Sequence, residues 1–163
     1  MENKQAEELE KLKSIIKDVE VAMLTTNDGG VLRSRPMQTQ QAEFDGDLWF
    51  FTSSNTHKAE EIEKDNRVNV SYAAPADNSY VSISGTAEIV TDKAKMEELW
   101  SPILKAWFPK GLDEPDIILL KVNANQAEYW DSASSSLVQA FGLLKSLVTG
   151  ERADGGEHAQ ISL

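Results

Sequence analysis

The stretch FFTSSNTHKAEEIEKDNRVNVSY, residues 50–72, carries the clearest signal for the fold. It begins as a hydrophobic strand, crosses the polar loop 53–56, and continues as a short helix predicted over 57–64, with Thr56 in the capping position. A second strand is predicted over 67–74, and Pro75 ends it. The pattern therefore places the free N–H groups of a helix N-terminus directly after a strand.

The first turn of this helix carries His57 and Lys58, two basic residues beside the partial positive charge of a helix N-terminus. That placement is unfavourable, and a bound phosphate would reverse the penalty. Local conflicts of this kind concentrate at functional sites. The stretch therefore predicts a phosphate site, with a plain hydroxyl cap and a solvated Lys58 as the alternative.

Outward toward the N-terminus, the spacing of apolar residues changes from helical to alternating. Leu9, Leu12, Ile15 and Ile16 form one apolar stripe of a helix. Asn27-Asp28-Gly29-Gly30 and Asp45-Gly46-Asp47 are turn sequences. The predicted elements on this side are a helix over 3–17 and strands over 19–26, 31–40 and 48–52.

Outward toward the C-terminus, two long strands are separated by a helix and a region rich in proline. Gly85 marks a bend in the first strand, and 123–125 a bulge in the second. The predicted elements are a strand over 80–90, a helix capped by Thr91 or Asp92 that runs to about Trp100, a strand over 117–130 and a helix over 136–149. Leu137, Phe141, Leu144 and Val148 share one side of that last helix, and Gly150 ends it. The polar tail 151–163 is predicted to be disordered, which leaves 1–150 as a single domain.

About six strands joined by tight turns favour antiparallel pairing, so the fold class is mainly β, with helices at the start, middle and end. A small barrel would hide the strand edges.

Composition excludes several functions. The chain of 163 residues has no cysteine and a net charge of −11, so disulfides are excluded and nucleic acid is disfavoured as a partner. No apolar run approaches the roughly 20 residues that span a bilayer, and the N-terminus lacks the apolar core of a signal peptide. We therefore expect a cytoplasmic protein with no membrane partner. The histidines, His57 and His158, form no metal-binding pattern, so no metal site is predicted.

A second basic cluster, Arg33-Ser34-Arg35-Pro36-Met37, lies on the strand predicted over 31–40. Arg33, Arg35 and Met37 alternate and so share one face. Two guanidinium groups on one face repel each other unless an anion sits between them. The alternative is a solvated edge strand that ends at Pro36.

Taken in order, these segments resemble the pyridoxamine 5′-phosphate oxidase-like superfamily of FMN-binding split β-barrels, and its bacterial general stress protein branch in particular. The resemblance rests on residues 50–72, on the strand from Arg33 to Gln38, on the glycine-bent strand YVSISGTAEIV, and on Tyr129-Trp130. It covers residues 18–132 in consistent order.

The resemblance implies a homodimer with FMN at the subunit interface. Arg33 and Lys58 would hold the FMN phosphate, helped by Thr52 and His57. The flavin ring and ribityl chain would be bordered by backbone groups of Arg33, Ser34, Arg35, Pro36, Met37, Phe51 and Thr52. Tyr80 stands where relatives contact the flavin from the other subunit, and Trp130 matches a tryptophan beside the flavin.

Two departures argue against a true pyridoxamine-phosphate oxidase. Gln38 replaces the lysine of those enzymes, and Asp131-Ser132-Ala133-Ser134 replaces their Arg-x-His segment. Three functions stay open: an FMN-dependent oxidoreductase of unknown substrate, with NAD(P)H or another small molecule as electron donor; a flavin-binding stress protein without turnover; and a binder of another flat cofactor such as a deazaflavin or haem. A single His57 is poor support for haem.

Overall fold

The structure, a computed structural model, describes residues 2–40, 43–132, 136–150 and 156–163. The helices are α1 (Glu2–Lys17), α2 (His57–Lys64), α3 (Lys93–Leu99) and α4 (Ser136–Thr149). The strands are β1 (Val21–Asp28), β2 (Val31–Gln38), β3 (Asp47–Ser53), β4 (Arg67–Ala74), β5 (Ser79–Val90), β6 (Ile117–Asp131) and β7 (Glu157–Ser162). Short 3-10 turns lie at Pro75–Asp77, Pro102–Ala106 and Gly111–Asp113.

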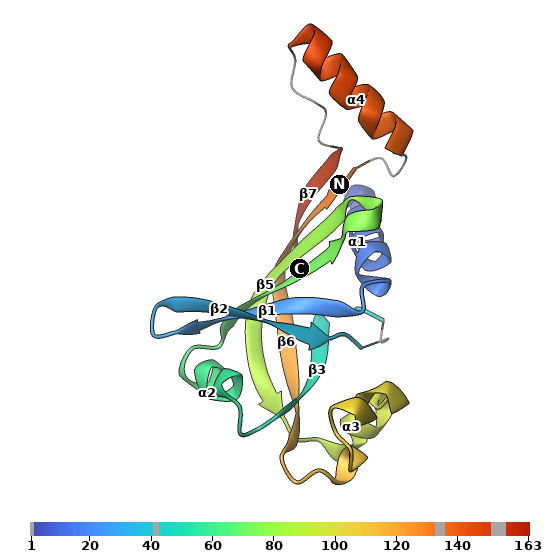
Figure 1. The fold of residues 1–163 in the computed structure, drawn as a ribbon. Coiled ribbons are helices and arrows are strands. Elements are labelled where there is room, and N and C mark those ends of the chain that lie inside the picture. Colours follow the sequence, from blue (N-terminus) through green and yellow to red (C-terminus); the bar gives the residue numbers. More distant parts are fainter. Residues whose placement is uncertain (1, 41–42, 133–135, 151–155) are drawn as a thin grey trace.

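The strands form one antiparallel sheet in the order β2-β1-β4-β5-β6-β3, and β7 pairs with β6 beyond this path. Figure 1 shows the sheet curling into a half-barrel, with α1 along one side, α2 beneath the β1–β2 hairpin, and α4 standing clear of the sheet. The predicted mainly-β class with an antiparallel split barrel is confirmed. Among the described residues, no helix is long and apolar enough to cross a membrane.

The core forms because side chains alternate along the strands. Along β5, buried Val81 and Ile83 alternate with outward-facing Tyr80 and Ser82. Inward-facing residues of β1, β4, β5 and β6 pack with Leu12, Ile15 and Ile16 of α1 into the main core. A second cluster joins Phe51 of β3 to the α3 region, where Trp100 meets Phe51 edge-on at 5.7 Å between ring centroids. The buried residues therefore form two clusters, one that includes α1 and one that includes α3.

A bulge interrupts the pairing of β5 with β6 where the sequence predicts one. Ser84 pairs with Gln126 and Gly85 with Ala124, so Asn125 is the extra residue. A Cβ atom at Gly85 would lie 2.1 Å from the carbonyl oxygen of Asn123. Close backbone approach therefore requires glycine at this bend, as predicted.

The C-terminal tail corrects a sequence prediction. Residues 157–162, predicted to be disordered, form β7 along the end of β6. The polar composition concealed an apolar anchor, Ile161, which is 3% exposed and lies in the main core, against which partly buried Ala159 also packs. Residues 151–155 lie outside the described part of the chain, as do the side chains of Leu137 and Phe141.

Candidate functional site

The two arginines of β2 lie on its inner face, as their alternation predicts. The register pairs Arg33 with Thr26 and Arg35 with Leu24 of the neighbouring strand β1. Helix α2 lies beneath this hairpin (Figure 1) and brings the side chains of Lys58 and Glu61 to the arginines. Two strands and one helix thus build a cluster of charged groups.

Glu61 is the carboxylate at the centre of this cluster, and it is 5% exposed. It accepts hydrogen bonds from the Thr26 hydroxyl at 2.5 Å and from Arg35 Nη2 at 2.9 Å. Arg33 Nη1 donates to its other oxygen at 3.3 Å and also to Asp28 at 3.3 Å. An anion does lie between the two guanidinium groups, and the protein itself supplies it.

Lys58 differs from the arginines because, within the described part of the chain, its ammonium has no hydrogen bond or ion pair. Burial lowers the pKa of Lys58 below its usual value, and the nearby Arg35 charge lowers it further, while Glu61 acts in the opposite direction. Three cationic side chains, those of Arg33, Arg35 and Lys58, meet the two carboxylates of Glu61 and Asp28. The cluster therefore keeps one net positive charge and can take a small anion.

The side chains of the polar loop before α2 form hydrogen bonds within the protein. The Thr56 hydroxyl donates to the Ser53 carbonyl oxygen at 2.9 Å and makes no cap bond, so the predicted side-chain cap is wrong although the helix begins at the expected place. The Ser53 hydroxyl donates to Asp116 and lies 2.7 Å from the side-chain amide of Asn55. Phe51 and Thr52 are buried at the end of β3.

The His57 side chain is 86% exposed, and its contact to a charged partner is a distant one, 3.9 Å to Glu60. The structure therefore does not bring His57 into the cluster around Glu61, unlike Lys58. A helix of this kind turns neighbouring residues about 100° apart, so one of two consecutive basic residues faces the strand and the other faces solvent.

The predicted aromatic contacts lie in a different row of the sheet. Tyr80 pairs with Trp130, and His158 of β7 pairs with Trp130 from the other side. The rings of Trp130 and His158 stack, with centroids 5.2 Å apart and planes within 9°. His158 Nε2 lies 2.7 Å from a carboxylate oxygen of Glu128. Ser34 and Pro36 alternate with the arginines on β2 and so take the face that Trp130 shares.

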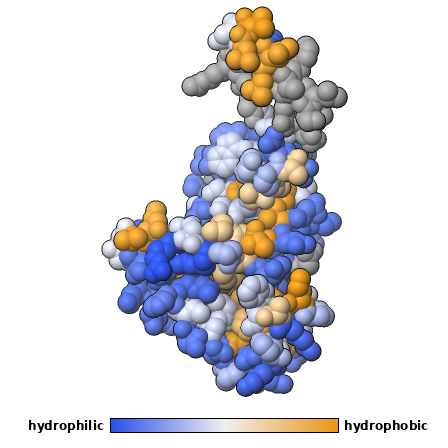
Figure 2. Space-filling model, in the orientation of Figure 1, coloured by the Kyte–Doolittle hydropathy of each residue, from blue (hydrophilic) through white to orange (hydrophobic). Residues whose placement is uncertain are grey.

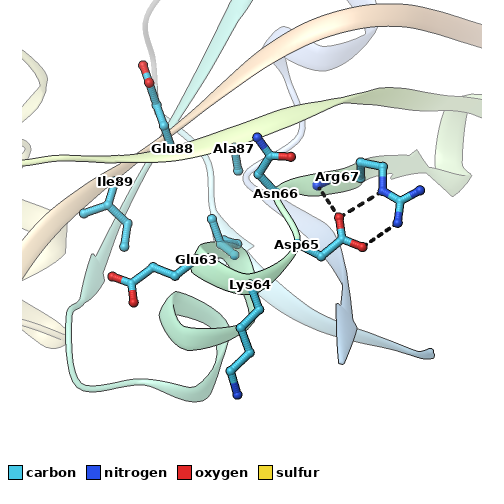
Figure 3. A pocket seen from close by; sticks show the side chains of 9 residues that line it. Glu63, Lys64, Asp65, Asn66, Arg67, Ala87, Glu88 and Ile89 are labelled. Carbon is cyan, nitrogen blue, oxygen red and sulfur yellow. Dashed lines mark hydrogen bonds and ion pairs between the residues drawn. The ribbon is translucent and has the colours of Figure 1, made fainter. Parts of the chain in front are cut away.

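An open pocket of about 590 Å³ lies at the other end of α2, and no predicted site residue lines it (Figure 3). Its most prominent charges neutralise each other, because Arg67 donates to Asp65 at 2.6 and 2.9 Å. These bonds hold the pKa of Asp65 well below its usual range. The cluster around Glu61 is the better candidate for ligand binding.

Sequence reasoning found Arg33, Arg35 and Lys58 but missed Glu61 and Thr26. A signal existed, since Lys58 and Glu61 are three residues apart and share a helix face. Among the described residues, no group of three or more histidine, cysteine or acidic side chains could hold a metal ion.

A curled antiparallel half-barrel with a cationic cluster under its first hairpin places the chain in the class of small split β-barrels. The chain belongs to the family described as "Pyridoxamine 5'-phosphate oxidase like", which it matches over residues 7–154. It is 29% identical to Protein bli-3 of Neurospora crassa over 162 residues, which covers 93% of this chain and 78% of that protein.

Solved structures agree with this assignment. A crystal structure from Jannaschia sp. CCS1, named for general stress protein 26, matches with a TM-score of 0.78 and 26% identity, over 97% of this chain and 99% of that one. The general stress FMN/FAD binding protein of Xanthomonas citri matches with a TM-score of 0.69 and 29% identity, over 77% of this chain and 89% of that one.

Proposed function

We propose that the chain is an FMN-binding protein of the general stress type that works as a flavin-dependent oxidoreductase in the cytoplasm. The observation that carries this proposal is the cluster of Arg33, Arg35 and Lys58 around Glu61, with an ammonium group that lacks a partner in the described part of the chain. Similarity to a protein named for FMN/FAD binding supports a flavin as the ligand.

The residues present fit a flavin mononucleotide. Its terminal phosphate is a dianion, which matches the half-exposed Arg33 and the half-buried Lys58. When bound, the flavin supplies the redox chemistry, and the protein supplies binding and orientation. Ser34, Pro36 and Met37 of β2, together with Phe51 and Thr52 of β3, would border the rest of the molecule by the family resemblance.

We further propose a homodimer with the flavin at the subunit interface. Strand register places Met23, Ser71, Ser82 and Glu128 in one row of the outer sheet face, and Ala73, Tyr80, Trp130 and His158 in the next. Met23, Tyr80 and Trp130 are exposed large residues on that face. In the proposed dimer, Tyr80 and Trp130 of one subunit would contact the flavin held by the other.

Apolar residues outside the core support association as well. Figure 2 shows them gathered on α4 and at the tip of the β1–β2 hairpin, where Val31 and Leu32 are exposed. On α4, Leu143, Leu144, Leu147 and Val148 are all exposed. Apolar surface of this kind is typical of protein contacts.

Two measurements test the proposed function in sequence. A visible absorption spectrum of the purified protein, and of the protein titrated with FMN, should show bound flavin. An anaerobic assay should then show that NADH or NADPH bleaches the flavin band. A protein that binds no flavin at micromolar concentration contradicts the proposal as a whole.

The second candidate is a flavin-binding stress protein without turnover. The observation that favours it is that the polar groups of Glu61, Thr26 and Arg35 are hydrogen-bonded to one another, which leaves them less available to act on a substrate. Flavin binding without reduction by NADH or NADPH would select this candidate.

A further inference from the structure

The two arginines of the cluster are held very differently. Arg35 is 20% exposed and donates to the Thr26 hydroxyl at 2.6 Å and to Glu61 at 2.9 Å. Arg33 is 50% exposed, and its two contacts, to Asp28 and to Glu61, are both 3.3 Å long. Charge-assisted hydrogen bonds are normally about 2.7–2.9 Å. Arg35 is therefore fixed by short bonds, and Arg33 is held loosely.

Glu61 contacts both arginines, each through a different carboxylate oxygen. An ionised carboxylate is costly to bury unless donors surround it. Thr26 and Arg35 occupy one of its oxygens at 2.5 and 2.9 Å, and Arg33 reaches the other. Thr26 in turn accepts from Arg35, so Thr26, Arg35 and Glu61 form a closed triangle of hydrogen bonds.

We propose that Glu61 is a positioning residue that binds Arg35 into the protein and leaves Arg33 and Lys58 as the pair that takes the ligand's phosphate. The inference rests on the proposed function, because it assigns separate roles to the residues of that same site. Arg35 then serves as a fixed support that orients Glu61 and keeps the β1–β2 hairpin against α2.

A simpler role for Glu61 predicts the opposite change in FMN affinity when Glu61 is replaced. If its negative charge only competes with the phosphate for the arginines, its removal raises the net positive charge of the cluster and tightens the binding of an anion. If Glu61 positions the cluster, its removal frees Arg35, lets the guanidinium groups repel each other, and weakens binding despite the added positive charge.

The test compares Glu61→Gln with Asp28→Asn, because each substitution removes one negative charge that contacts Arg33 at 3.3 Å. Asp28 is half-exposed and touches neither Arg35 nor Thr26 among the described contacts, so it serves as the matched charge control. Dissociation constants for FMN and for riboflavin, which lacks the phosphate, are measured by quenching of flavin fluorescence.

We expect Glu61→Gln to weaken FMN binding by about 5-fold or more, with riboflavin binding within about 2-fold of the wild type. Asp28→Asn should bind FMN as tightly as the wild type or more tightly. Equal or tighter FMN binding by Glu61→Gln overturns the inference, because it shows that the carboxylate only competes.

A charge-neutral variant covers the case in which Glu61→Gln does not fold. Thr26→Val keeps the shape of a β-branched residue in β1 and removes the hydroxyl that joins Arg35 to Glu61. It should weaken FMN binding at least about 3-fold, and a change within about 2-fold overturns the inference. A wild-type protein that binds no FMN contradicts the proposed function itself, whereas tight wild-type binding that is insensitive to Glu61 and Thr26 contradicts only this inference.

Discussion

At the scale of the residue, the central fact is that one buried carboxylate meets two guanidinium groups. Glu61 comes from α2 and the arginines come from β2, so the contact depends on the folded arrangement of segments 26 and 28 residues apart. Lys58 extends the cluster toward solvent without a bonded partner among the described residues. The site thus has a fixed part, Arg35 and Glu61, and an available part, Arg33 and Lys58.

Truncating either residue of the available part should weaken the binding of FMN and leave the binding of riboflavin unchanged. Arg33→Ala and Lys58→Ala each remove one charge-assisted contact to the phosphate, which costs about 1.5–3 kcal/mol, or about 10- to 150-fold in affinity. Fluorescence titration of both ligands measures the effect. A misfolded variant would lose both ligands, and FMN affinity within about 2-fold of the wild type in both variants would place the anion site elsewhere.

As the pH rises, FMN binding should weaken earlier than it would if Lys58 had the pKa of an ordinary lysine. The pKa of Lys58 is lowered, first by burial and then by Arg35, so the side chain loses its positive charge early as the pH rises. As the pH rises toward the ordinary lysine pKa of about 10.4, FMN affinity should therefore fall while riboflavin affinity stays level. Lys58→Arg keeps its charge throughout this range and should give a flat profile for both ligands. A wild-type profile as flat as that of Lys58→Arg would show that Lys58 does not contact the phosphate.

At the scale of the element, sequence patterns predicted most strands and helices because alternation and turn residues act locally. They failed at β7, where buried Ile161 within a polar segment pairs with Ala127, 34 residues earlier in the chain. They failed also at the Thr56 cap, because the Ser53 carbonyl oxygen competes for the same hydroxyl. Glu61 was missed because it looks like any other acidic residue of an exposed helix until the hairpin covers it.

The anchoring of β7 can be tested through protein stability. Ile161→Ala removes a nearly fully buried side chain, so we expect the free energy of unfolding to fall by about 2 kcal/mol or more. Gln160→Ala, at the exposed neighbouring position, should change it by less than about 0.5 kcal/mol. Urea unfolding followed by circular dichroism measures both. Equal midpoints for the two variants would show that Ile161 does not anchor β7 to the core.

At the scale of the whole molecule, the exposed rows of the outer sheet face and the exposed side of α4 leave apolar surface that a second copy could cover. The flavin site as proposed draws residues from both subunits, so assembly and ligand binding are linked. Acidic side chains outnumber basic ones 27 to 16, which favours solubility of the assembled form.

The proposed homodimer predicts a particle of twice the 18.0 kDa chain mass in light scattering at micromolar concentration. Met23→Lys places a charge in the outer row and should shift the particle toward the mass of one chain, because burying an unpaired charge is costly. Ile103→Lys, at an exposed position outside those rows, is the matched control and should leave the mass unchanged. A wild-type particle of 18.0 kDa under these conditions contradicts the dimer.

The chain should not oxidise pyridoxamine phosphate at enzymatic rates. Gln38 cannot supply the positive charge that a lysine would offer, and Asp131 stands where a basic segment would bind the substrate. We therefore expect turnover well below about 1 s⁻¹ in an assay of pyridoxal phosphate formation with the FMN-loaded protein. Turnover above that rate would show that other residues bind the substrate.

The pairing of β3 has a consequence for how the protein is made on the ribosome. Within the described sheet, β3 pairs with β6 and with no other strand, and its last residue Ser53 lies opposite Ile117, 64 positions later. At a synthesis rate of about 5–20 residues per second, β3 waits roughly 3–13 s for its partner to be made, and longer for it to leave the exit tunnel. Its Trp-Phe-Phe segment is apolar and has a bare edge during that interval. The nascent chain is therefore prone to aggregation at β3 until residues 117–123, which pair with it, have emerged.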